Sequence, residues 1–130
     1  MRLWLALAAA ALAAVALSIP AQGAAPERIL AGARLAAQRD DGFYWSVRDR
    51  GGNRIGYLVM DCSPSLQGIR QCTASLSLPG GKVHFSGSLR HVTGFSLTLT
   101  GSSGAYAAHQ RGDLVVTQGR VGWTVGVHLR

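Results

Sequence analysis

Apolar and polar residues alternate with a period of two in seven short segments between residues 43 and 129. For example, Val125, Val127 and Leu129 share one side of a segment whose other side carries Gly126 and His128. Successive side chains of a β-strand point to opposite faces, so this pattern predicts strands that each bury one face. The predicted strands are 43–48, 54–62, 71–78, 82–90, 95–100, 113–118 and 121–129.

Short turns rich in glycine, proline and asparagine separate these segments, as in Gly51-Gly52-Asn53 and Pro79-Gly80-Gly81. Many short strands joined by tight turns are typical of an antiparallel sandwich or barrel. Consecutive hairpins favour a meander that closes on itself. The sequence therefore predicts an all-β protein, a small antiparallel closed barrel of seven to eight strands, with the barrel domain at residues 43–130.

The segment that precedes this region is ambiguous. Residues 24–42 are rich in alanine and arginine, and their apolar positions fit one helical face only loosely. Three alternatives stay open for this N-terminal segment: a helix, a weak first strand or a mobile arm.

The first 23 residues have the three parts of a secretory signal peptide. Arg2 supplies the basic head, an apolar run extends from Leu3 to Leu17, and small residues lead to Gly23. A retained membrane anchor is the alternative, but about 15 apolar residues fall short of the roughly 20 that a spanning helix needs. We expect cleavage after Gly23, a secreted or periplasmic protein, and no stable membrane span after processing.

Two cysteines, Cys62 and Cys72, are the only ones in the chain. An exported protein with an even cysteine count predicts a Cys62–Cys72 disulfide. This spacing matches no zinc motif.

The chain is strongly basic, with a formal net charge of +7, and Lys82 is the only lysine among its 13 basic residues. Such a protein adheres to anionic envelope polymers, lipid headgroups or nucleic acid, although a solubilising surface is the simpler interpretation. Specific nucleic-acid binding calls for aromatic residues interleaved with basic ones. Phe43-Tyr44-Trp45 beside Arg48 and Arg50 is the only local hint, so we expect no specific nucleic-acid partner.

The four histidines, His84, His91, His109 and His128, show no ligand spacing, so we expect no metal site and no cofactor. His84 and His128 fall on polar strand faces and are expected to point outward. Serine, histidine and the acids Asp61 and Asp113 are all present, but no G-x-S-x-G motif supports a serine hydrolase.

Several motifs occur together in an informative order. They are G-x-x-x-G at Gly52 to Gly56, Cys62, L-P-G-G at Leu78 to Gly81, the small residue Gly87, and T-G-S-S-G-A-Y at Thr100 to Tyr106 with Gly112 behind it. In this order and spacing, the region from Phe43 to Arg130 resembles the allene oxide cyclase-like and dirigent-like β-barrel family. The resemblance implies an eight-stranded antiparallel barrel with an apolar cavity, trimeric in many plant members. A homo-oligomer is therefore among the expected assemblies.

The resemblance also shapes the expected function. Tyr44 stands where the plant cyclases carry a glutamate, and Cys72 has no counterpart there, so plant-type cyclase chemistry is not expected. We expect instead a disulfide-stapled barrel that binds a small apolar ligand or a surface partner. The alternative is an isomerase or cyclase that folds a small hydrophobic substrate inside the barrel, because orientation alone can supply large rate factors. Tyr44, Tyr57 and Asp61 are its weak catalytic candidates, and Phe85, Phe95 and Trp123 are the expected cavity walls.

Overall fold

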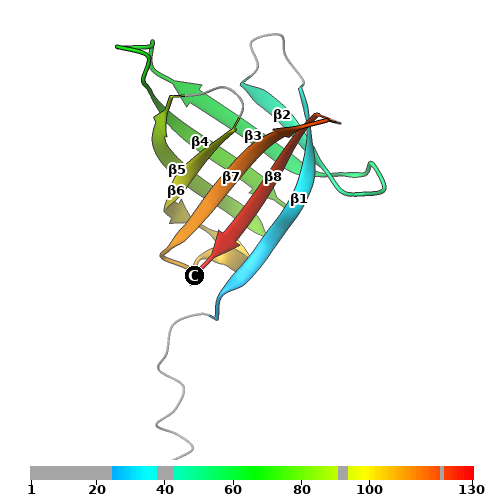
Figure 1. The fold of residues 1–130 in the computed structure, drawn as a ribbon. Helices are drawn as coiled ribbons and strands as arrows, with labels where there is room; N and C mark the ends of the chain where they lie inside the picture. Colours follow the sequence, from blue (N-terminus) through cyan, green and yellow to red (C-terminus); the bar gives the residue numbers. More distant parts are fainter. Residues whose placement is uncertain (1–24, 38–42, 91–93, 121) are drawn as a thin grey trace, which may run out of the picture.

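Eight antiparallel strands form one closed barrel in a computed structural model, which describes residues 25–37, 43–90, 94–120 and 122–130 (Figure 1). Each strand pairs with its neighbours in sequence, and β1 pairs with β8 to close the barrel. The predicted all-β closed barrel is confirmed, with eight strands. The predicted signal peptide, residues 1–23, lies outside the described residues. The elements are β1 (Glu27–Ala37), β2 (Tyr44–Arg48), β3 (Arg54–Cys62), β4 (Arg70–Leu78), β5 (Gly81–Leu89), β6 (Gly94–Ser102), the 3-10 helix η1 (Gly104–Tyr106), β7 (Gly112–Gly119) and β8 (Gly122–Leu129).

The N-terminal segment contributes the closing strand. Of the three alternatives left open for residues 24–42, a strand forms over Glu27–Ala37, whereas residues 38–42 are outside the described part of the chain. β1 pairs with β2 on one side and with β8 on the other. The barrel therefore begins at residue 27, and β1 covers two strand edges that would otherwise be unpaired.

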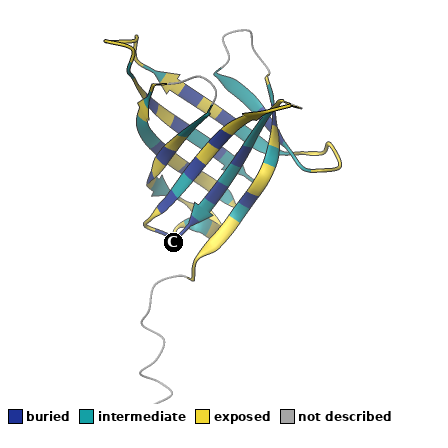
Figure 2. Cartoon of the chain, viewed as in Figure 1, coloured by how far each residue is buried: buried dark blue, intermediate teal, exposed yellow. Residues whose placement is uncertain are grey.

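Burial alternates along the strands, and the apolar face of each strand points into the barrel (Figure 2). Inside the barrel, the large Phe85 on β5 lies opposite the small Ala74 on β4. On its other side, Phe85 pairs with Leu99 on β6. The buried hydrophobic residues form one cluster: Leu30, Leu35, Val47, Leu58, Met60, Cys72, Ala74, Leu76, Val83, Phe85, Leu97, Leu99, Leu114, Val116, Val125, Val127 and Leu129.

Two turn motifs of the sequence pack against each other at the end of the barrel where the C-terminus lies (Figure 1). The backbone N–H of Ala105 donates to the carbonyl oxygen of Gly80 at 2.8 Å, and that of Ser103 donates to Lys82 at 2.9 Å. Gly104 has a φ of 64°, and a Cβ there would collide with the oxygen of Gly80. The L-P-G-G hairpin and the T-G-S-S-G-A-Y corner thus form one unit, which only small residues permit.

The predicted disulfide is confirmed, with an Sγ–Sγ distance of 2.02 Å between Cys62 and Cys72. The two residues are direct partners across β3 and β4, so the bond staples the end of this hairpin. Within the described ranges, no helix has the length and apolar character needed to cross a bilayer.

Candidate functional site

The middle of the barrel is filled by its own side chains. Leu58, Leu76 and Val83 have no accessible surface, and Phe85 keeps 1% of its own. A side chain that borders a void large enough for water would keep accessible surface toward that void. An eight-stranded barrel is just narrow enough to be filled in this way. The candidate sites therefore lie on the outer wall.

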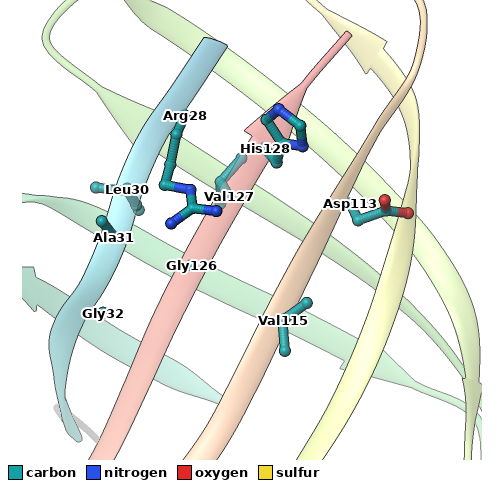
Figure 3. Close-up of a pocket in the computed structure, with 9 residues that line it drawn as sticks. All are labelled: Arg28, Leu30, Ala31, Gly32, Asp113, Val115, Gly126, Val127 and His128. Atoms are coloured by element: carbon teal, nitrogen blue, oxygen red, sulfur yellow. The ribbon is translucent and has the colours of Figure 1, made fainter. Parts of the chain in front are cut away.

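The larger of two described hollows on the outer wall is a groove across β1, β8 and β7, which we call the outer groove (Figure 3). It has a volume of about 460 Å³ and opens to solvent. Its lining residues are Arg28, Leu30, Ala31, Gly32, Asp113, Val115, Gly126, Val127 and His128.

The groove exists because β1 is irregular where it passes β8. The register between these strands shifts twice, between Arg28 and Leu30 and again between Leu30 and Ala33, so β1 carries extra residues relative to its partner. Gly32, within the second shift, has a φ of 72°, a left-handed conformation that suits a glycine bulge. The floor beneath is Gly126, which lacks a side chain; a Cβ there would meet only the oxygen of Leu30, at 3.6 Å.

The polar end of the groove is positively charged. Arg28, His128 and Asp113 are consecutive cross-strand partners on β1, β8 and β7. The carboxylate of Asp113 accepts a hydrogen bond from the Arg130 guanidinium at 2.7 Å, which balances its charge. Arg28 forms no ion pair with any residue that the structure describes, and Figure 3 shows its side chain extending toward β8. The groove therefore presents an unbalanced guanidinium beside an imidazole.

The other end of the groove is apolar. Val115 is 45% exposed there, an unusual position for a large aliphatic side chain, and Ala31 is also exposed. The hollow thus combines a cationic end with an apolar wall, an arrangement that suits a ligand with an anionic head and an apolar body.

The three weak catalytic candidates all lie on the outer wall, on the neighbouring strands β2 and β3. The rings of Tyr44 and Tyr57 are close, with centroids 5.6 Å apart and planes inclined by 43°. Asp61 follows Tyr57 by four residues on β3, which places it roughly 13 Å further along the strand. Asp61 also lies two residues beyond Val59, the cross-strand partner of Tyr44, so Tyr44 is the diagonal neighbour of both Tyr57 and Asp61. The catalytic role of these three residues stays a prediction.

Asp61 borders a second hollow of about 300 Å³ over β3, β4 and β5. There the Ser75 hydroxyl and His84 Nδ1 are 2.7 Å apart. Among the described residues, no carboxylate hydrogen-bonds to the His84 ring, so the third member that orients the base in a Ser-His-Asp triad is absent from this pair. His84 is exposed, as its position on a polar strand face predicted.

The three expected cavity walls belong to the hydrophobic cluster. Phe85 is a packed core residue with 1% of its surface accessible, and its role in lining a cavity stays a prediction. Phe95 and Trp123 are half-buried and pack against the same cluster near the ends of β6 and β8. A role for these two in lining a cavity stays a prediction.

No sequence pattern singled out His109, but the residue is buried in the structure, with 6% of its surface exposed. Its Nε2 lies 3.3 Å from the Glu27 carboxylate, which can only accept, so Nε2 carries the hydrogen. Its Nδ1 is buried without a partner among the described residues. His109 thus links the corner after η1 to the start of β1. No periodicity could have revealed this contact, because the two residues are 82 positions apart.

No group of three or more potential metal ligands comes together in the part of the chain that the structure describes. In comparisons with known proteins, no family model, no curated protein and no solved structure matches this chain. The resemblance to the allene oxide cyclase-like barrels accordingly stays a prediction.

Proposed function

We propose that this chain is a secreted or periplasmic binding barrel without catalytic activity, and that it holds a small organic anion with an apolar body in the outer groove. The observation that carries the proposal is Arg28, whose charge no described residue balances, at the end of a hollow with an apolar wall. A guanidinium can bind a carboxylate through two parallel hydrogen bonds, and the neighbouring His128 offers a further donor. The disulfide supports an oxidising location.

This proposal replaces an internal apolar ligand with one on the wall. A substrate inside the barrel would have to displace side chains that keep 0–1% of their surface, such as Leu58 and Phe85. The same packing argues against the alternative function, an isomerase or cyclase that acts in the interior. The outer groove needs no rearrangement, because the bulges of β1 and the bare floor at Gly126 already provide the space.

The affinity is expected to be modest. The groove is open, so a bound ligand keeps part of its surface in water, and a single ion pair near solvent adds little. We expect dissociation constants for an alkyl carboxylate on the order of 10⁻⁴ M, equivalent to about 5.5 kcal/mol.

Titration calorimetry with octanoate tests the proposal, with the uncharged octanamide as the ligand control. Arg28→Gln is expected to weaken octanoate binding about two- to fivefold, since an ion pair near solvent contributes about 0.5–1 kcal/mol. Arg70→Gln, which removes an exposed arginine at the start of β4, is the matched control and should leave binding unchanged. Equal binding of octanoate and octanamide, or equal losses in both variants, would contradict the proposal.

A second pair of variants tests the apolar part of the groove. Gly126→Val fills the floor with a residue that favours strands, and its Cβ meets no atom closer than 3.6 Å. Gly101→Val is the control, because this glycine is also within a strand and its Cβ would meet only the His84 ring at 3.9 Å. Gly126→Val should abolish octanoate binding while Gly101→Val preserves it. If both variants bind as well as the original protein, the ligand does not occupy this groove.

A further inference from the structure

Three arginines stand side by side on the outer wall, away from the outer groove. Arg34 on β1 is the direct cross-strand partner of Arg48 on β2, and Arg48 is the partner of Arg54 on β3. We call these three residues the arginine row. Arg34 and Arg48 point outward because their chain neighbours Leu35 and Val47 are buried in the core.

Arg54 joins the same outer face through a register shift. Val47 on β2 pairs with Gly56 on β3, but the next residue, Arg48, pairs with Arg54. β3 therefore has one extra residue at this point. Such a bulge reverses the face to which the next side chain points. The contact of Arg54 with the outward Tyr57 agrees, because the guanidinium carbon lies 4.9 Å from the centre of that ring.

Like charges directly opposite each other destabilise a sheet, since the Cβ atoms of such partners are only roughly 4.5–5.5 Å apart. Within the described residues, no member of the row forms an ion pair. Arg48 donates to the carbonyl oxygen of Gly52 at 2.8 Å, and the nearby Asp49 carboxylate accepts from the backbone N–H of Asn53. The repulsion is therefore left without an anionic counterpart in the described chain, which points to an anionic partner outside it.

The surface beside the row is amphipathic. Tyr57 contacts Arg54, and the ring of Tyr44 lies beyond it with its centroid 5.6 Å from that of Tyr57. Val59, the cross-strand partner of Tyr44, is 41% exposed. Tyrosine is enriched where one side of a residue meets an apolar phase and the other meets water, as at the surface of a bilayer. Asp61 lies two residues beyond Val59 on the same strand, so the basic and aromatic surface ends at an acidic residue there.

We infer that the arginine row, with Tyr44, Tyr57 and Val59 beside it, is a docking surface for a membrane that exposes anionic lipid phosphates. Arginine suits this partner because its planar guanidinium binds phosphate through two hydrogen bonds and is weakly hydrated. A convex barrel wall meets a flat lipid surface along a strip, and the row provides such a strip across three strands. Single-stranded nucleic acid would need open aromatic platforms, but Arg54 already covers one face of Tyr57.

Vesicle cosedimentation tests this inference with protein purified from an exporting host. Vesicles contain either phosphatidylcholine alone or phosphatidylcholine mixed with phosphatidylglycerol. The double variant Arg34→Gln/Arg54→Gln leaves the Arg48 hydrogen bond intact. Each arginine near an anionic surface is expected to change binding about fivefold, so the double variant should bind roughly 25-fold more weakly to the anionic vesicles.

The control double variant Arg70→Gln/Arg120→Gln has the same net charge but lies off the row. Equal losses in both double variants would show that net charge alone drives adhesion and would overturn the inference. The inference would also be overturned if the protein binds an oligothymidine strand more tightly than vesicles and the row variant abolishes this oligothymidine binding. Equal binding to the anionic vesicles and to vesicles of phosphatidylcholine alone would overturn the inference as well.

Thermal melts provide a second, independent measurement. Arg34→Gln and Arg54→Gln remove like-charge repulsion, while Arg54→Gln also removes the contact with the Tyr57 ring, so the row variant should melt within roughly 5 °C of the original protein. A larger drop in melting temperature would identify the row as structural and overturn its assignment as a docking surface. The row variant leaves Arg28 in place, so octanoate binding in the outer groove is tested separately.

Discussion

The substitution Phe85→Ala tests whether the barrel is filled as described. Phe85 is 1% exposed and spans the space between Ala74 and Leu99. Its neighbour Ala74 is already small, so the hollow left by the phenyl ring cannot be filled from that side. Truncation of a buried phenylalanine to alanine costs about 3–5 kcal/mol in the free energy of unfolding. We expect the upper part of this range.

Urea unfolding, followed by tryptophan fluorescence, measures this loss. A domain of this size has a total stability of about 5–15 kcal/mol, so the variant should still fold but at a melting temperature roughly 15–30 °C lower. Phe95→Ala, at a half-buried position near the end of the barrel, is the control and should lose clearly less.

The Phe85→Ala variant should also have a ligand-binding cavity inside the barrel. Apolar cavities made by truncation stay dry and can bind benzene, and a ligand that binds only the folded state raises its stability. Benzene is therefore expected to raise the melting temperature of Phe85→Ala and to leave that of the original protein unchanged. If benzene stabilises both proteins equally, the original barrel already contains a cavity and the reasoning from burial is refuted.

Three further predictions concern the stability of the barrel. Reduction of the Cys62–Cys72 disulfide, which closes a loop of sequence separation 10, should lower the free energy of unfolding by about 2.7 kcal/mol; an unchanged urea midpoint would contradict this. Gly56→Ala should cost about 1–3 kcal/mol because its Cβ would collide with the backbone of β4, whereas Gly101→Ala should stay within about 0.5 kcal/mol; comparable losses in the two melts would show that the close approach at Gly56 is not limiting. A chain that starts at residue 43 lacks β1 and should fail to unfold cooperatively in circular dichroism, because two strand edges are left open; a cooperative melt would mean that seven strands suffice.

Local patterns carried much of the fold. Alternation along residues 71–78 and 82–90 predicted which side chains of β4 and β5 face inward, because the period of a strand leaves one buried face per segment. The first strand could not be recognised in the same way. Its two bulges and Gly32 interrupt the alternation, so the apolar residues of β1 no longer recur every second position.

The candidate sites were less accessible to prediction. Tyr44, Tyr57 and Asp61 were selected by residue type, and only the pairing of β2 with β3 shows that Tyr44 is the diagonal neighbour of both Tyr57 and Asp61 on the outer wall. The outer groove had no sequence signal, since a bulge in β1 and a glycine in β8 form it only when the barrel closes.

The sequence by itself determined the strand pattern, the turns and the cysteine pair, because these depend on neighbours along one chain. Only the tertiary structure decided that the barrel interior is packed and that Arg34, Arg48 and Arg54 stand in one row. Both properties depend on the register between strands, which is set by the closure of the whole barrel. A one-residue difference in register would turn every side chain of a strand to the opposite face.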